Sequence, residues 1–239
     1  MMTTDQVKGN PLRKEIENMI QTLDQQALLY QAGALHGHIC NYLGYGVMGG
    51  AAAIRELGVH NTGMEEVVAI VETNNCFSDG VQMATGCSFG NNALIYRDLG
   101  KTAFSLVKKD GEGVRYILDP DFEDSRQEEY PEAYGLWNEL VAEKKDGTPE
   151  KFARMMKLFH EITLKDLDVP IEKMFRIRKG TFVLPPPSMM YPWVRCAACG
   201  ENIMESRARR IKGEIICLEC ANETIYAMDS RGIGVWLPG

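Results

Sequence analysis

Apolar residues recur at steps of three and four positions near the start of the chain, and this spacing predicts an amphipathic helix over residues 12–27. Pro11 lies beside the first of them, where a missing backbone N–H costs nothing. Farther on, a short run rich in β-branched residues at 66–73 predicts a buried strand. Segments 102–108 and 114–118 flank Asp110-Gly111-Glu112-Gly113, and this arrangement predicts a hairpin.

The pattern turns helical over residues 124–147 and again from Thr148, a suitable N-cap with Pro149 at the first helical position. This second helix carries an apolar stripe, which is more typical of packing or of a dimer face than of a cofactor site. His160 flanks the stripe and is interpreted as a surface residue. We expect a last strand at 181–184, followed by a semi-rigid Pro-rich linker at 185–190.

A helix rich in small residues is expected between the first helix and the first strand. We predict that Gly33 loosens the chain and that the helix begins near Cys40 or Asn41, with glycine and alanine filling 44–53. Because small residues lower helix propensity, this helix must be held by close packing against a neighbouring backbone. A short helix at 79–85 should follow the first strand.

Composition limits the classes of protein. The chain has 239 residues, 45% of them hydrophobic, which is enough for one or two domains with real cores. Its net charge of −7 argues weakly against nucleic acid as the main partner. Residues 1–6 lack the features of a signal peptide, and no apolar run is long enough to span a membrane. Seven cysteines without an export signal suggest reduced thiols in the cytoplasm.

Histidine and cysteine gather in two short clusters on either side of the predicted 66–73 strand. We predict that these residues bind one divalent metal, Zn²⁺, Ni²⁺ or Fe²⁺, because imidazole and thiolate are ligands of these ions. The strand and the small-residue helix should bring the clusters together, and Asp79 could orient a ligand histidine from behind. The candidate ligands, of which three or four would bind, are His36, His38, Cys40, Cys76 and Cys87.

Two backbone conformations would bring the first cluster's ligands together. If residues 36–40 were helical, His36 and Cys40 would share a face and His38 would point away. If they were extended, all three side chains would project to the same side. The alternative without a metal is that these are buried helix-start residues satisfied by backbone groups, since free cysteine is often simply a small buried hydrophobe.

The C-terminal segment contains two Cys-x-x-Cys pairs at a separation typical of structural zinc. The segment is short and poor in core residues, so we expect Zn²⁺ to supply most of its folding free energy. Six basic and six acidic residues lie at 191–239, so four thiolates on Zn²⁺ would leave it slightly negative. Its basic run at 207–212 is therefore interpreted as a solvated turn rather than a nucleic-acid contact. The predicted ligands are Cys196, Cys199, Cys217 and Cys220.

The two cysteine-containing regions resemble known families. His-Gly-His-Ile-Cys, the small-residue helix and the run from Cys76 through Asn91 resemble the FmdE family of formylmethanofuran dehydrogenase subunits, from about residue 30 into the 180s. The C-terminal module is similar to TraR/DksA-type zinc fingers. The resemblance implies an α+β fold, a metal site at the His and Cys motifs, and a dimer. It also implies association with a molybdenum or tungsten enzyme that reduces CO₂ onto methanofuran.

One position departs from the family pattern, because Cys40-Asn41-Tyr42 stands where members usually have Cys-Pro-Gly. The family name describes a subunit and not a catalytic role, so function stays open. The chain could be a metal-binding accessory or subunit in one-carbon metabolism. It could instead be an independent enzyme, with an open metal position and Cys76 or Cys87 as a reactive thiol. A zinc-finger regulator is the third alternative.

These observations predict a chain of two folded parts. An α+β metal-binding domain should occupy residues 1–184 and a small four-cysteine zinc finger residues 191–239, with the linker between them. We expect a cytoplasmic homodimer.

Overall fold

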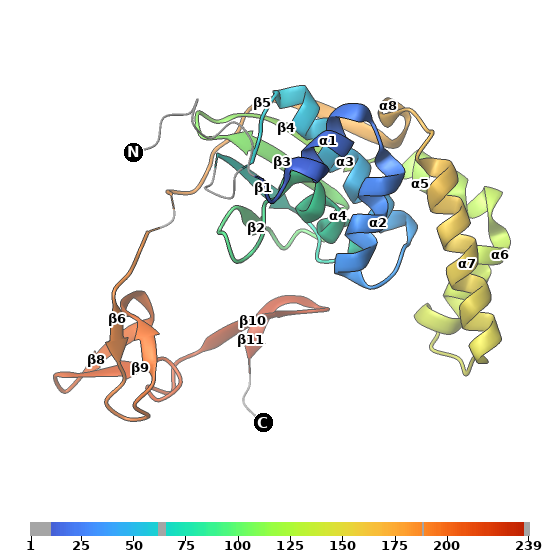
Figure 1. Ribbon diagram of the computed structural model, residues 1–239. Coiled ribbons are helices and arrows are strands. Elements are labelled where there is room, and N and C mark those ends of the chain that lie inside the picture. Colours follow the sequence, from blue (N-terminus) through green and yellow to red (C-terminus); the bar gives the residue numbers. More distant parts are fainter. Residues whose placement is uncertain (1–10, 62–65, 188, 237–239) are drawn as a thin grey trace. The chain divides into compact units, whose positions relative to one another are not determined.

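A computed structural model describes residues 11–61, 66–187 and 189–236 (Figure 1). The N-terminal residues, in which no signal peptide is predicted, lie outside these ranges. The chain forms two compact units, Met1–Leu184 and Pro185–Gly239, each considered below by itself. Among the described residues, no helix combines the length and apolarity needed to span a membrane.

A five-stranded sheet forms the centre of the first unit, in the order β2-β1-β3-β4-β5. β1 and β2 are parallel, and every other pairing is antiparallel. The predicted strand at 66–73 and the predicted hairpin are both confirmed. The bounds of the strands are Val67–Val71 (β1), Leu94–Tyr96 (β2), Ala103–Lys108 (β3), Glu112–Leu118 (β4) and Phe175–Thr181 (β5).

The prediction of a last strand at 181–184 is wrong, because β5 ends where that segment begins. Phe175 is buried in the core and Ile177 packs against it, while the residues between and after them are charged. This sparse alternation suits an edge strand, which needs only one apolar face. Its pairing with β4, from Leu118↔Phe175 to Glu112↔Thr181, is what identifies it.

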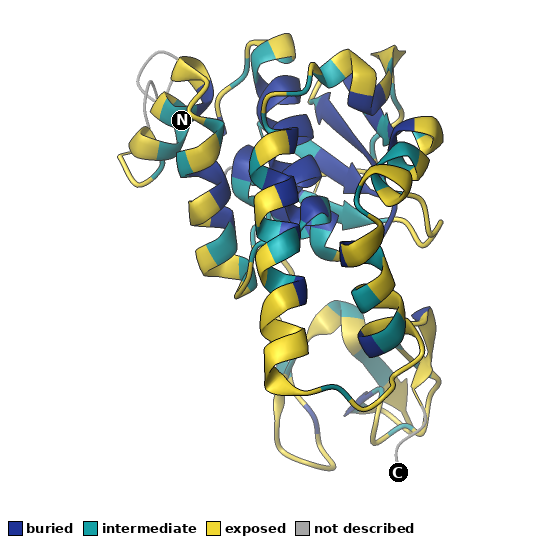
Figure 2. Ribbon diagram, turned by 90° about the vertical axis from the view of Figure 1, so that its right-hand side faces the viewer, coloured by how far each residue is buried: buried dark blue, intermediate teal, exposed yellow. Residues whose placement is uncertain are grey.

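Four helices precede or interrupt the first strands and contribute the apolar core that packs on the sheet (Figures 1 and 2). The predicted single helix at 12–27 is wrong. Leu23 adopts a left-handed φ of 61°, and Asp24 caps a new helix by accepting a hydrogen bond from the Ala27 N–H. Gly33 does not interrupt that second helix. The bounds are Lys14–Thr22 (α1), Gln25–His36 (α2), Asn41–Leu57 (α3) and Cys76–Thr85 (α4).

α3 and α4 touch backbone to backbone, as the small residues of α3 led us to expect. A Cβ added at Gly46 would lie 2.0 Å from the Phe77 carbonyl oxygen. One added at Gly80 would lie 2.3 Å from the Leu43 carbonyl oxygen. Only glycine permits so close an approach. The contact fixes the first turns of the two helices relative to each other.

The segment between β4 and β5 is helical. Thr148 caps its longest helix by accepting from the Lys151 N–H, as predicted, with Pro149 in the first turn. The stripe on that helix packs inward at Met155, Phe159 and Ile162, in agreement with the packing interpretation. The bounds are Pro120–Glu129 (α5), Pro131–Trp137 (α6), a π-helical turn at Asn138–Ala142, Pro149–Asp166 (α7) and Ile171–Met174 (α8).

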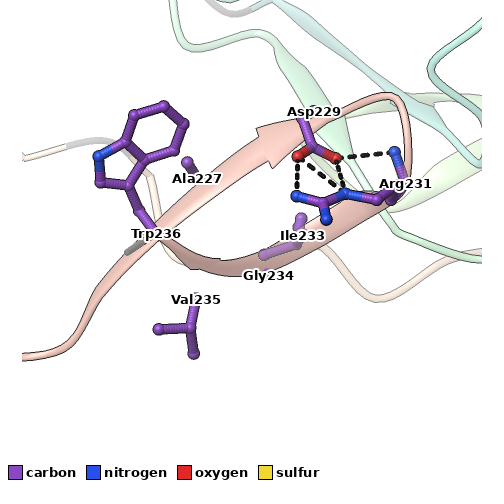
Figure 3. Close-up of a pocket in the computed structure, with 8 residues that line it drawn as sticks. Ala227, Asp229, Arg231, Ile233, Gly234, Val235 and Trp236 are labelled. Atoms are coloured by element: carbon purple, nitrogen blue, oxygen red, sulfur yellow. Dashed lines mark hydrogen bonds and ion pairs between the residues drawn. The ribbon is translucent and has the colours of Figure 1, made fainter. Parts of the chain in front are cut away.

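The second unit consists of three two-stranded ribbons around a very small core of Cys196, Ile216 and Cys217. At the tip of its last ribbon Asp229 accepts hydrogen bonds from Arg231, below a shallow pocket lined by Trp236 and Val235 (Figure 3). The bounds are Trp193–Arg195 (β6), Asn202–Met204 (β7), a 3₁₀ turn at Glu205–Arg207, Ala208–Ile211 (β8), Glu214–Cys217 (β9), Ile225–Asp229 (β10) and Gly232–Trp236 (β11).

Candidate metal centre

The first ligand cluster lies at the junction of α2 and α3, and its backbone is neither helical throughout nor extended throughout. His36 is the last residue of α2, and Gly37 turns the chain with φ 93°. Cys40 is the extended N-cap residue of α3. The sharp turn, which glycine makes without strain, brings His36, His38 and Cys40 together across a helix end and a helix start.

The second cluster lies at the start of α4 rather than on a strand. Asn75 caps α4 by accepting from the Phe77 N–H, so that Cys76 is the first helical residue. Asp79 follows three residues later on the same face of the helix. Because α3 and α4 touch near their starts, Cys40 and Cys76 are brought together at two helix N-termini, where N–H groups favour thiolate.

Four side chains converge at this point. One ligand atom from each of His36, His38, Cys40 and Cys76 lies within 4.8 Å of the others. His36 Nδ1 donates to Asp79 Oδ2 over 2.7 Å, as predicted for a carboxylate behind a ligand histidine. Its other nitrogen, Nε2, is buried and has no hydrogen-bond partner among the described residues. An orphaned buried nitrogen beside two sulfurs fits a bound divalent metal.

The electrostatics of the cluster favour one thiolate in the absence of metal. A hydrogen bond from Cys40, together with nearby His36, lowers the pKa of Cys76 to about 5. The same hydrogen bond and burial raise the pKa of Cys40, which keeps its proton. Burial lowers the pKa of His36, but the hydrogen bond to Asp79 and the charge of Cys76 outweigh burial and raise it overall. The cluster therefore supplies a ready anionic sulfur.

Cys87 does not join this cluster, in contrast to the prediction. α4 runs back along β1, so its ten residues carry the chain about 15 Å away from the end of β1 where Cys76 lies. The Cys87 thiol is fully buried beside the Val67 carbonyl oxygen, at the other end of β1, and Asn61 Nδ2 donates to it over 3.5 Å. Burial raises its pKa to about 11, so it remains a neutral thiol in the core.

The second unit brings together the other four cysteines, which lie within the same 4.8 Å limit. Two backbone N–H groups point at sulfur: Cys217 N donates to Cys196 Sγ and Cys220 N donates to Cys217 Sγ, each over 3.3 Å. Backbone donors lower the pKa of Cys196 to about 6. The arrangement of Cys196, Cys199, Cys217 and Cys220 suits tetrahedral zinc.

Sequence reasoning missed a buried polar network directly beyond Cys40. Asn41 Nδ2 donates to the Tyr134 hydroxyl over 2.9 Å, and the Tyr45 hydroxyl donates to Asp166 over 2.9 Å. Arg126 also donates to Asp166, whose exposed fraction is 1%. The partners come from helices far apart in the chain, so the only available signal was polar residues at buried positions of α3 and α7. The network holds α3 against α6 and α7.

Comparisons with known proteins agree with this geometry. Residues 35–176, more than half of the chain, match the family described as FmdE, molybdenum formylmethanofuran dehydrogenase operon. The chain belongs to the FmdE family. Residues 190–226 match the prokaryotic dksA/traR C4-type zinc finger, so both resemblances noted in the sequence are confirmed.

Two similar proteins place this FmdE family member further. A probable S-adenosyl-L-methionine-binding protein from Archaeoglobus fulgidus is 39% identical over 214 residues, which cover 86% of this chain. The alignment spans 55% of that relative, so this chain covers only about half of its length. The crystal structure of a tungsten formylmethanofuran dehydrogenase FmdE-like protein from Syntrophus aciditrophicus aligns over 82% of this chain and 91% of that one, with a TM-score of 0.52 and 22% identity. The predicted α+β fold, an FmdE-like domain followed by a four-cysteine module, is confirmed.

Proposed function

We propose that this protein binds metal at two places, one divalent ion in the FmdE-like domain and one Zn²⁺ in the C-terminal module. The observation that carries the first site is the buried, unpartnered Nε2 of His36, which faces sulfur while Nδ1 is held by Asp79. A buried polar atom without a partner is costly, and a metal ion would satisfy it.

The donor set favours Zn²⁺ at the first site, with Ni²⁺ or Fe²⁺ as alternatives. Two sulfurs and two imidazole nitrogens match the tetrahedral preference of zinc, and the same mixture also suits the softer divalent ions. An ion held by all four groups would serve a structural or sensing role, whereas one held by three would keep a position for Lewis-acid chemistry. Within the chain, Asp79 would fix the tautomer and orientation of His36 in either case.

We further propose that the protein is an accessory or subunit of molybdenum- or tungsten-dependent one-carbon metabolism, as a cytoplasmic homodimer. The family's description and the name of the Syntrophus aciditrophicus protein support the metabolic link. Co-purification from the native host tests it, because a molybdenum or tungsten oxidoreductase should be recovered with the tagged protein. Recovery of the dimer alone, under conditions that keep such enzymes intact, would favour the alternative of an independent metal-dependent enzyme.

Metal content of the full chain tests the first site. We expect two equivalents of metal per wild-type chain and one in Cys76→Ala, since removing a thiolate ligand abolishes tight binding. The matched control is Cys87→Ala, which also removes one cysteine from the same domain but leaves all four ligands. Equal metal content in Cys76→Ala and wild type, or equal loss in both variants, would contradict the proposed site.

A further inference from the structure

The four ligands of the first site are not held equally, and this inequality rests on the metal site proposed above. Three of them are anchored. The His36 side chain is 14% exposed and is fixed by Asp79. Cys40 and Cys76 begin the two helices whose backbones meet at Gly46 and Gly80, so neither sulfur can move far without moving a helix.

His38 is the exception. It is the exposed member of the group, and it lies in the turn between α2 and α3. Within the part of the chain that the structure describes, no hydrogen bond holds its ring. Its ring contact is with His36, at 4.4 Å between centroids and an angle of 42°. The neighbouring Ile39 packs against the core, so the backbone is fixed while the His38 side chain reaches into solvent.

The cost of leaving the metal therefore differs between the two histidines. If His36 left, it would break the hydrogen bond to Asp79 and leave a buried nitrogen unsatisfied. If His38 left, its ring would be solvated by water and would regain side-chain freedom, and both effects offset the lost metal bond. A ligand from solvent can reach the vacated position because it opens to the surface.

We propose that His38 is the exchangeable ligand of the centre and that its position is an entry site for a small nitrogen or sulfur donor from solution. His36, Cys40 and Cys76 form the retained three-ligand base. The position occupied by His38 is then the one at which a substrate, or an acceptor of the metal, joins the coordination sphere. One site can thus be closed at rest and open when an external donor arrives.

Cobalt-loaded full-length chains test this inference, with imidazole as the probe. The C-terminal module is the same in every variant, so its bands subtract. In His38→Ala we expect the sulfur-to-cobalt bands of the first site to remain and cobalt affinity to fall less than about tenfold, below the effect typical of losing an outer-shell partner. Imidazole should then bind saturably, shift the ligand-field bands and restore the affinity.

His36→Ala, from the same turn, is the matched variant. We expect its affinity to fall more than about 100-fold, beyond the outer-shell range, with no rescue by imidazole because the vacated space is buried. If His36→Ala fails to fold by circular dichroism, Asp79→Asn replaces it. Asp79→Asn should weaken cobalt binding about 10–100-fold, more than His38→Ala does.

Transfer of cobalt to a chelator gives an independent readout. The rate in His38→Ala should exceed that of wild type, and the rate in Asp79→Asn should show no dependence on imidazole. An affinity loss in His38→Ala as large as in His36→Ala or Asp79→Asn, or no response of His38→Ala to imidazole, would overturn the inference while leaving the metal site intact. A wild-type chain that binds only one metal would instead overturn the proposed function.

Discussion

The two ligand clusters use the same kind of sulfur donor, but they are assembled over different distances and by different forces. The four cysteines of the C-terminal module come from two local turns around a core of three buried residues. His36 and Cys76 come from helix ends that are brought together by a large apolar core and a glycine contact. The first cluster is therefore built by the fold, whereas the second module is built by its metal.

The difference has a physical cause. A module with so little buried apolar surface cannot offset the entropy of ordering its chain, so the metal must supply the missing free energy. The FmdE-like domain buries helices α3 and α4 against its sheet and needs no ion to fold. Its ligands are held close before metal arrives, which favours affinity and control over the coordination sphere.

The largest expected effect is loss of the C-terminal module when its zinc is removed. Structural zinc typically supplies about 10–16 kcal/mol, more than so small a core can replace. Cys199→Ser should therefore release zinc and make residues after Leu184 sensitive to protease, while the first unit melts as in wild type. Limited proteolysis with mass spectrometry checks this expectation. Stoichiometric zinc in the module of Cys199→Ser would show that the fourth thiolate is not needed.

Disturbing the glycine contact should act in the opposite sense, on the first unit alone. In Gly46→Ala the new methyl group would meet the Phe77 carbonyl, and such overpacking costs about 1–3 kcal/mol or more. The shift should also separate Cys40 from Cys76 and weaken the first metal site. Urea unfolding and metal titration measure the two effects.

Gly135→Ala is the control, since nothing lies within 4 Å of its added Cβ in helix α6. It should be neutral or stabilise the protein by up to about 1 kcal/mol, because alanine favours helix over glycine. Equal stability of Gly46→Ala and wild type would mean that α3 and α4 do not need their close approach.

A smaller effect should come from the buried ion pair at the end of β1, four residues before Cys76. Glu72 is 3% exposed and accepts two hydrogen bonds of 2.7 Å from Arg115, which lower its pKa. Glu72→Gln should cost about 1–3 kcal/mol at pH 7, as for a lost charge-assisted hydrogen bond.

The sign of the pH dependence follows from the lowered pKa. The stabilisation by Glu72 is present above the unfolded-state value of roughly 4.3 and is lost as pH falls through the lower folded-state value. Denaturant unfolding at pH 7 and pH 3 should therefore show wild type and Glu72→Gln converging in acid. Glu132→Gln, which alters an exposed pair with Arg154, should change stability little at either pH. A constant difference for Glu72→Gln across this range would contradict the linkage.

Much of the chain could be predicted from its sequence because the deciding forces act over a few residues. The cap at Thr148-Pro149, the turn between β3 and β4 and the β-branched strand β1 are all local patterns, and all three appear in the structure. The two Cys-x-x-Cys pairs are local as well, which explains why the C-terminal cluster was identified completely. The glycine-rich sequence of α3 even indicated the close helix contact.

The first ligand cluster required tertiary structure. Sequence proximity placed five candidates together, but only the direction of α4, antiparallel to β1, separates Cys87 from Cys76. The division of the first helix at Leu23 and the placement of β5 depended in the same way on which surfaces each element could bury. Chain-local patterns determine where an element forms and which ligands it carries. Packing over the whole domain decides which end of each element faces which, and therefore which ligands meet.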